Sequence, residues 1–285
     1  MRLKLAGRIS QGSGLVNEDG VGFIGRQDDA QAAWALDGVT GINNASLGLA
    51  RSDAQWFVGR IDAHLRALLP DARDVTILMS DLVDRLIADQ AQATALSALP
   101  ETYDPPAACI AALCRIGSEW HAIRLGDCRF LGEDARGFRR IVDFANDGFD
   151  EWITREAQRF RAEGLSDIKV ISARLQPKLF ANRRRRNRPG GYGVITADRA
   201  CLAFVEHLPL VDPHSALMTT DGFFRLVDHY HEMTEEDLLA RASRDGAIPA
   251  LYDRLRAIER SDPDCIKFPR FKPADDASAI ALTRR

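Results

Sequence analysis

The order in which two kinds of hydrophobic pattern follow one another most constrains the fold of this 285-residue chain. Short apolar runs bounded by glycines or polar turns predict strands at residues 3–9, 21–24 and 32–36. Apolar residues at helical spacing then predict a helix hairpin over 50–68 and 75–87. Strands and helices therefore come in groups and do not alternate singly, which favours an α+β layered domain over a doubly wound α/β domain.

The second half of the chain repeats this grouping. Apolar runs predict strands, and amphipathic segments after them predict helices. No internal repeat or low-complexity linker is visible, so residues 1–285 are predicted to form a single domain with a charged helical insertion at about 147–190. The strands are expected at 109–114, 120–125, 192–197, 202–205, 217–220 and 277–282, and the helices at 223–230, 235–244 and 249–260.

Composition limits the function classes. A hydrophobic content of 46% is ample for a core, and the net charge of −3 gives no general attraction to nucleic acid or to an anionic membrane. No segment resembles a signal peptide or a spanning helix, so a cytoplasmic protein is expected. The five cysteines are dispersed in apolar runs and the six histidines show no ligand spacing, which favours core thiols over a zinc site or disulfides.

Acidic residues lie at the ends of four predicted strands. Asp37 and Asp221 each follow an apolar run and each precedes a glycine, whereas Asp275 and the pair Glu18 and Asp19 stand just before apolar runs. Such positions deliver carboxylates from buried strands to a surface edge. Carboxylates without nearby His or Cys ligands suit hard divalent cations, so one oxygen-lined metal site is predicted.

Five short motifs follow one another over nearly the whole chain. They are Asn17-Glu18-Asp19, Asp37-Gly38 with Gly41, Gly126-Asp127-Cys128-Arg129, Thr220-Asp221-Gly222 and Asp275-Asp276-Ala277-Ser278. Each motif alone is weak evidence, but in this order they resemble the motifs of the metal-dependent protein phosphatases, the type 2C serine/threonine phosphatases, in their bacterial form. The resemblance implies a four-layer α-β-β-α sandwich, in which two antiparallel sheets are flanked by helices.

The resemblance also implies roles for these residues. Asp37 would bridge two Mn²⁺ or Mg²⁺ ions, with the Gly38 carbonyl on one ion and Asp221 and Asp275 on the other. Glu18 and Asp19 would hold metal-bound waters, and Asp127 with Asp221 would bind a third ion. The implied activity is hydrolysis of phosphoserine and phosphothreonine in a kinase or regulatory protein by a metal-activated water, with Asp37 and Asp221 as the catalytic residues.

One departure from the family pattern concerns the substrate phosphate. The family usually has a phosphate-binding arginine three residues before the position of Asn17, and Gly14 stands there in this chain. Arg8 and the arginine-rich residues 183–188 are candidate replacements. If nothing replaces that arginine, the alternative is a catalytically weak or silent regulatory protein that keeps the phosphatase fold.

Other interpretations of the same residues remain. Each Asp-Gly pair could be an ordinary turn, Asp127 could pair with Arg129, and residues 183–188 could be a solvated charged face. An aspartyl-phosphate mechanism at Asp37 is rejected, because that chemistry needs a second aspartate two residues later and Val39 is there. A nucleic-acid binder is disfavoured because the chain is acidic and the arginine run lacks interleaved aromatic residues.

Overall fold

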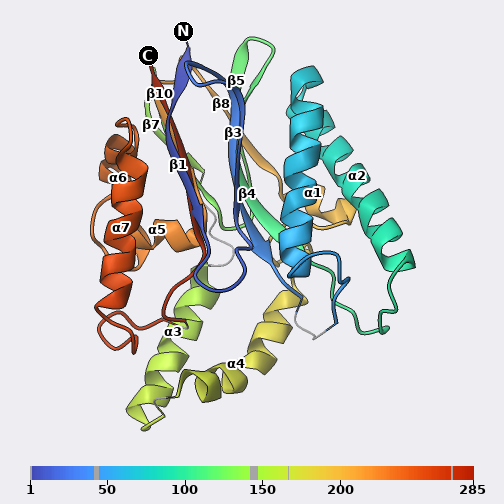
Figure 1. Ribbon diagram of the computed structural model, residues 1–285, viewed down its shortest axis with the longest axis vertical. Coiled ribbons are helices and arrows are strands. Elements are labelled where there is room, and N and C mark those ends of the chain that lie inside the picture. Colours follow the sequence, from blue (N-terminus) through green and yellow to red (C-terminus); the bar gives the residue numbers. More distant parts are fainter. Residues whose placement is uncertain (1, 42–44, 142–146, 166, 271) are drawn as a thin grey trace.

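A computed structural model describes residues 2–41, 45–141, 147–165, 167–270 and 272–285. Two antiparallel five-stranded sheets pack face to face with helices on both outer faces, which confirms the predicted four-layer α+β sandwich (Figure 1). The strand orders are β1-β10-β9-β6-β7 and β2-β3-β4-β5-β8. The strands are β1 (Leu3–Gln11), β2 (Gly20–Arg26), β3 (Asp29–Val39), β4 (Ala107–Ile116), β5 (Glu119–Leu125), β6 (Arg129–Asp134), β7 (Gly137–Ile141), β8 (Glu206–Leu210), β9 (Ser215–Thr219) and β10 (Ala277–Arg284).

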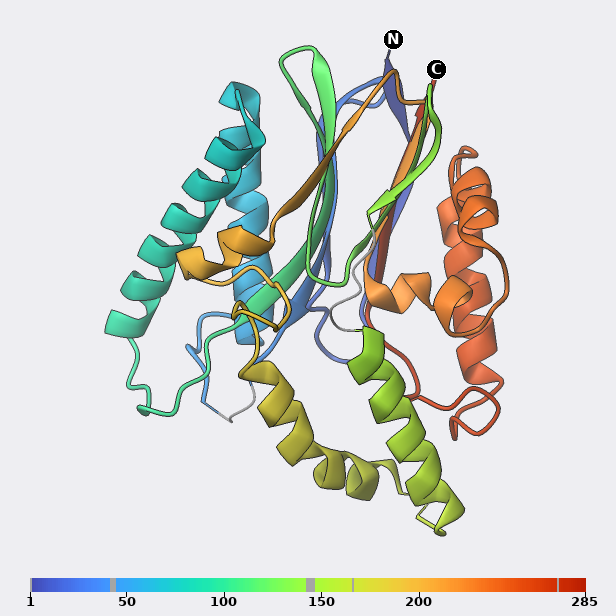
Figure 2. The same ribbon diagram turned by 180° about the vertical axis from the view of Figure 1, so that it is seen from behind.

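The helices are divided among three places on this sandwich. The hairpin of α1 and α2 covers the sheet that contains β3, and α5, α6 and α7 cover the other sheet (Figures 1 and 2). Helices α3 and α4 lie beyond the end of the sandwich that is opposite to the two termini. The helices are α1 (Asp53–Leu68), α2 (Val75–Ala95), α3 (Asp147–Ala162), α4 (Ile168–Arg183), α5 (Asp221–Asp228), α6 (Glu235–Ala242) and α7 (Ala247–Arg260).

Side-chain size on β3 shows how the layers are filled. Successive strand residues point to opposite faces of a sheet. The large side chains of Trp34 and Leu36 pack against α1 and α2, whereas Ala33 and Ala35 face the second sheet. All four are fully buried. Small residues between the sheets and large ones beneath the helices therefore hold β3, and the aspartate that follows Leu36, in a fixed position.

Two helix starts follow from side-chain capping. The Asp74 carboxylate accepts hydrogen bonds from the backbone N–H groups of Thr76 and Ile77 at the start of α2. The Thr234 hydroxyl accepts a hydrogen bond from the backbone N–H of Asp237 at the start of α6. Within the described ranges, no helix combines the length and the apolar character that crossing a bilayer requires.

Two predicted strands are wrong. Residues 192–197 form only isolated bridges, one of which joins Ile195 to Ala108 of β4. Residues 202–205 lie in and directly after the 3₁₀ helix η2 (Arg199–Phe204). The Asp198 carboxylate accepts a hydrogen bond from the Ala200 N–H and starts this turn, and its apolar side chains pack against the α1–α2 core. The apolar run therefore forms a partly buried 3₁₀ turn and not a strand.

Candidate metal centre

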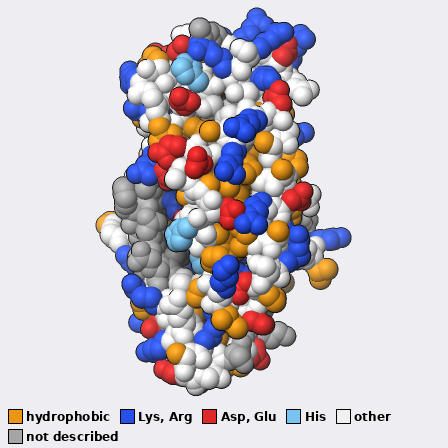
Figure 3. Space-filling model, turned by 90° about the vertical axis from the view of Figure 1, so that its left-hand side faces the viewer, with side chains coloured by type: hydrophobic (Ala, Val, Ile, Leu, Met, Phe, Trp, Pro, Cys, Tyr) orange, Lys and Arg blue, Asp and Glu red, His pale blue; other side chains and the backbone are white. Residues whose placement is uncertain are grey.

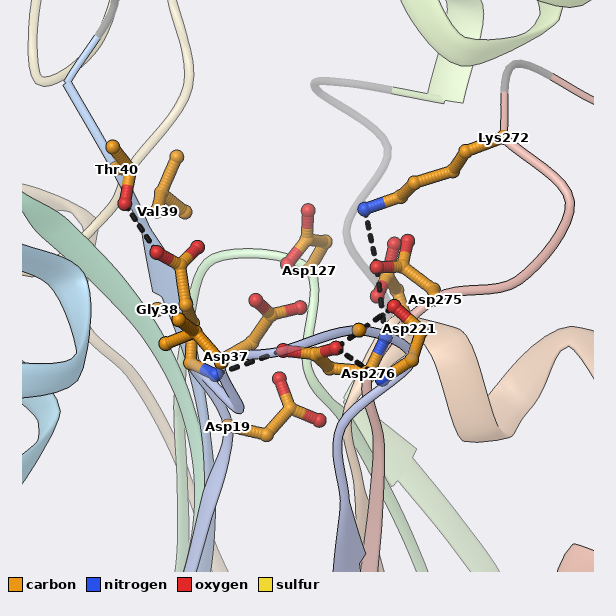
Figure 4. A pocket seen from close by; sticks show the side chains of 14 residues that line it. Asp19, Asp37, Gly38, Val39, Thr40, Asp127, Asp221, Lys272, Asp275 and Asp276 are labelled. Carbon is orange, nitrogen blue, oxygen red and sulfur yellow. Dashed lines mark hydrogen bonds and ion pairs between the residues drawn. The ribbon is translucent and has the colours of Figure 1, made fainter. Parts of the chain in front are cut away.

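Loops from both sheets converge on a pocket of about 420 Å³ at the end of the sandwich near α3 and α4. The lining contains every residue that the sequence nominates as a metal ligand, together with Asp276 (Figure 4). The first and the last of these residues, Glu18 and Asp276, are 258 positions apart in the chain, and the sandwich brings them together. The seven acidic residues are Glu18, Asp19, Asp37, Asp127, Asp221, Asp275 and Asp276.

Asp37 lies near the end of β3, opposite Cys109 of β4. The next residue is a glycine because another segment of backbone is very close. A Cβ atom on Gly38 would lie 2.5 Å from the carbonyl oxygen of Glu18. This close approach places the loop that carries Glu18 and Asp19 directly beside Asp37.

Asp221 is the first residue of α5, directly after β9. The preceding Thr220 hydroxyl donates to Asp19 Oδ2 at 2.7 Å and accepts from the Ser278 N–H at 3.0 Å. A Cβ on Gly222 would lie 2.0 Å from the backbone oxygen of Asp276. Threonine and glycine on either side of Asp221 thus join three segments of the site.

Asp276 is a pocket residue that the sequence interpretation did not assign a role. Its carboxylate accepts hydrogen bonds from the Ser13 N–H at 2.7 Å, the Ser13 hydroxyl at 3.0 Å and the Glu18 N–H at 2.8 Å. Asp276 therefore fixes the loop between β1 and β2, in which Gly14 lies. The acidic pair Asp275-Asp276 could be recognised in the sequence as part of the site. Only the fold decides that Asp276 holds the β1–β2 loop whereas Asp275 pairs with Arg225.

The crowded carboxylates change one another's protonation. Burial, and then the charges of Asp19 and Asp221, raise the pKa of Asp37 well above its ordinary value. Burial likewise raises the pKa of Asp19 and of Asp127. Burial opposes ionisation of Asp221 as well, but Arg225 and Lys272 hold its pKa below the ordinary value. In the absence of cations, burial and crowding therefore favour the protonated forms of Asp37, Asp19 and Asp127, whereas Arg225 and Lys272 favour an ionised Asp221.

Two cationic side chains that the sequence interpretation missed hold Asp275. Arg225 Nη2 on α5 donates to Asp275 Oδ2 at 2.7 Å, and the Lys272 ammonium forms an ion pair with Oδ1. Lys272 reaches over Asp275 from the side of the pocket opposite Thr40 (Figure 4). Among the described lining residues it is the only Lys or Arg. No sequence motif identifies Lys272 as a site residue. Its position three residues before Asp275 was the only signal that it lies near that carboxylate.

The position of Gly14 is open. Gly14 lines the pocket and is exposed, and a Cβ atom there would have no heavy atom within 4 Å. Arg8 lies on β1 and is not among the described lining residues. Residues 183–188 do not line this pocket either, but Arg183 and Arg186 line a neighbouring cavity that also contains Asp127.

The donor set fits hard divalent cations, because every ionisable ligand candidate in the pocket is a carboxylate. Asp127 Oδ1 is buried and has no hydrogen-bond partner among the described residues, as expected for an oxygen that a cation would bind. Across the described ranges, no group of three or more His, Cys, Asp and Glu side chains is arranged to hold a metal ion as it stands.

The comparison with known families agrees with this geometry. A family model described as protein phosphatase 2C matches residues 6–256, which is most of the chain. The chain belongs to this family. No curated protein sequence matches the chain significantly.

Solved phosphatase structures share the fold of this family member. The serine/threonine phosphatase PstP/Ppp from Mycobacterium tuberculosis has a TM-score of 0.56 at 14% identity, with both chains fully covered. Stp1 from Staphylococcus aureus has a TM-score of 0.53 at 13% identity, covering 100% of this chain and 98% of that one. PppA, a regulatory component of T6SS in Pseudomonas aeruginosa, has a TM-score of 0.54 at 15% identity, covering 99% and 98%. These identities are low, so they show the fold alone.

Proposed function

We propose that this chain is a metal-dependent protein serine/threonine phosphatase. The observation that carries the proposal is the convergence of seven carboxylates, one with an unpaired buried oxygen, in a pocket of the protein phosphatase 2C fold. A structure of the related PstP catalytic domain contains two manganese ions, at 14% identity and a TM-score of 0.51. A phosphate dianion could enter so acidic a pocket only if cations neutralised it.

Asp37, Asp221, Asp275 and the Gly38 carbonyl would hold two Mn²⁺ or Mg²⁺ ions, and Asp127 with Asp221 would take a third. When bound, such ions supply an activated water and neutralise charge on the phosphoryl group. Glu18 and Asp19 would accept hydrogen bonds from waters in the site. Ion binding requires that Asp37 lose the proton that crowding favours, so activity should rise with pH until this proton is released.

Lys272 would take part of the role of the arginine that Gly14 replaces. Its side chain is about half exposed at the pocket mouth. Burial disfavours its charge, but the charges of Asp275 and Asp221 raise its pKa, so the ammonium stays protonated. Once cations neutralise Asp275, this ammonium is available to a substrate phosphate. A single ammonium lacks the two-pronged geometry of a guanidinium, so phosphate binding should be weaker than with arginine.

Hydrolysis of an aryl phosphate and of a phosphothreonine peptide tests the proposal, measured with Mn²⁺, Mg²⁺ or chelator. We expect turnover that requires the metal and falls about 100-fold or more in Asp37→Asn and in Asp221→Asn. Asp81→Asn is the matched control, because Asp81 is exposed on α2. Metal-induced thermal stabilisation without turnover would indicate a catalytically silent regulatory protein, and no metal effect at all would refute the site.

A further inference from the structure

A second cavity, of about 610 Å³, is lined by residues of α2, the end of α4 and η2, and it shares no lining residue with the acidic pocket. Its wall carries four arginines, which belong to the arginine-rich residues 183–188 that the metal site does not use. We call it the basic cavity. The arginines are Arg183, Arg184, Arg186 and Arg188.

The acidic residues of the basic cavity neutralise only part of this charge. Asp104 pairs with Arg186 at 2.6 Å and lies 3.8 Å from Arg183. The Asp198 carboxylate is engaged by the Ala200 N–H at the start of η2. Arg184 and Arg188 are exposed, and neither forms an ion pair with any carboxylate in the described part of the chain. Two guanidinium groups therefore remain available to an anionic ligand.

A buried amide in the same wall is also poorly satisfied. Gln90 of α2 lines the basic cavity and is only 8% exposed. Its amide interacts with the Tyr103 side chain, but neither Nε2 nor Oε1 forms a hydrogen bond of good geometry with any described residue. Poorly satisfied polar groups are unfavourable when buried, and in native proteins they commonly mark a ligand. One donor and one acceptor side by side match the C=O and N–H groups of a peptide backbone.

A third cavity, of about 360 Å³, has lining residues in common with both the basic cavity and the acidic pocket. It shares Arg183 and Arg186 with the basic cavity, and Val39 and Asp127 with the acidic pocket. Its other lining includes apolar and aromatic side chains, such as Phe180 of α4. The surface beside α4 therefore carries, in order, the carboxylates of the acidic pocket, the apolar lining of the third cavity and the arginines of the basic cavity.

We propose that the basic cavity binds an acidic segment of the substrate protein while the phosphorylated residue of that segment occupies the acidic pocket. This inference rests on the proposed function and specifies the substrate class as phosphoproteins with Asp, Glu or a second phosphate near the cleaved phosphate. A nucleotide fits less well, because none of the described residues lining the basic cavity is aromatic and could stack on a base.

The test compares two phosphothreonine peptides of equal length, one with acidic and one with uncharged flanking residues. The measured quantity is the ratio of their kcat/KM values, with an aryl phosphate as the reference substrate in each variant. We expect the ratio to favour the acidic peptide and to fall about tenfold in Arg184→Glu with Arg188→Glu, as two exposed charge pairs would require. Added salt should lower the ratio in the wild type as well.

Arg244→Glu is the matched control for charge reversal. Arg244 is exposed between α6 and α7. On the face of the molecule on that side, acidic and basic side chains are interspersed (Figure 3). We expect this variant to keep the wild-type ratio. An unchanged ratio in the double variant, or an equal fall in the Arg244 control, would overturn the proposal.

A binding measurement separates this proposal from the proposed function. Fluorescence anisotropy of a labelled acidic peptide without phosphothreonine, in chelator, reports on the basic cavity alone. We expect binding that weakens about tenfold in the double arginine variant and also weakens in Gln90→Leu. This result would support the basic cavity even if the protein hydrolysed no phosphate. Displacement of the peptide by ATP at a lower concentration than by unlabelled peptide would overturn the choice of ligand.

Discussion

Substituting arginine for Gly14 should strengthen phosphate binding. Gly14 is exposed at the pocket, its added Cβ meets no atom within 4 Å, and its backbone does not have the positive φ that disfavours side chains. The steric cost to stability should therefore stay below about 0.5 kcal/mol. In Gly14→Arg the guanidinium could donate two parallel hydrogen bonds to a phosphate, whereas Lys272 offers one ammonium.

The size of the gain follows from the exposure of this position. A hydrogen bond to a charged group contributes about 1.5–3 kcal/mol when water is excluded. Since Gly14 lies at the open mouth, we take about 1.4 kcal/mol, which corresponds to roughly a tenfold rise in kcat/KM. If the arginine binds the phosphate equally strongly in the ground state and in the transition state, the gain should appear as a lower KM with an unchanged kcat.

Steady-state hydrolysis of an aryl phosphate with saturating Mn²⁺ is the assay. Gly14→Gln is the control for side-chain size, and Gly14→Lys is the control for a single point charge. We expect the largest gain with arginine, a smaller one with lysine and almost none with glutamine. An arginine variant no better than the glutamine variant would refute the reasoning that the pocket lacks a guanidinium to bind the phosphate with two hydrogen bonds.

Three further predictions concern stability and metal binding. Mn²⁺ at about 100 times its dissociation constant should stabilise the fold by about 2.7 kcal/mol per site, and melting curves should show no such shift in Asp37→Asn. Gly222→Ala should lower the free energy of unfolding by about 2 kcal/mol in urea titrations, because its Cβ would lie 2.0 Å from the Asp276 carbonyl oxygen. Although burial opposes its ionisation, backbone N–H groups and Arg270 lower the pKa of Asp262 to about 2, below the ordinary 3.8. The stability that Asp262 contributes is therefore present above about pH 4 and is lost as the pH falls through 2. Asp262→Asn should cost about 3 kcal/mol at pH 7, because the nearly buried Arg270 loses its 2.7 Å ion pair, and urea titrations near pH 2 should show little difference from the wild type.

Much of the layered fold could be predicted because periodicity reports local burial. The apolar run that contains Trp34 and Leu36 marks a buried strand, and the helical spacing through Phe57 and Ile61 follows from which face of the helix meets the core. The strand predicted over 202–205 was wrong for the same reason. An apolar run reveals that a segment is buried, but Leu202 and Phe204 are packed against the core by a capped turn and not by a sheet.

The carboxylates could be nominated from the sequence because each follows or precedes a strand, and because Asp37 and Asp221 each precede a glycine. The residues that contact those carboxylates could not be predicted from the sequence. The contacts of Asp276 with Ser13 and of Arg225 with Asp275 join residues 263 and 50 positions apart, and no local pattern records such pairs.

The sequence by itself therefore determined the order of the layers and the acidic residues offered to a metal site, since both depend on burial and chain direction within short segments. Only the tertiary structure decided which cations face that site. The packing of the two sheets puts Lys272 at the pocket and leaves Gly14 open. The placement of α4 directs the arginines of residues 183–188 to a separate cavity. These outcomes depend on distances between elements far apart in the chain, and such distances exist only once the sheets have packed.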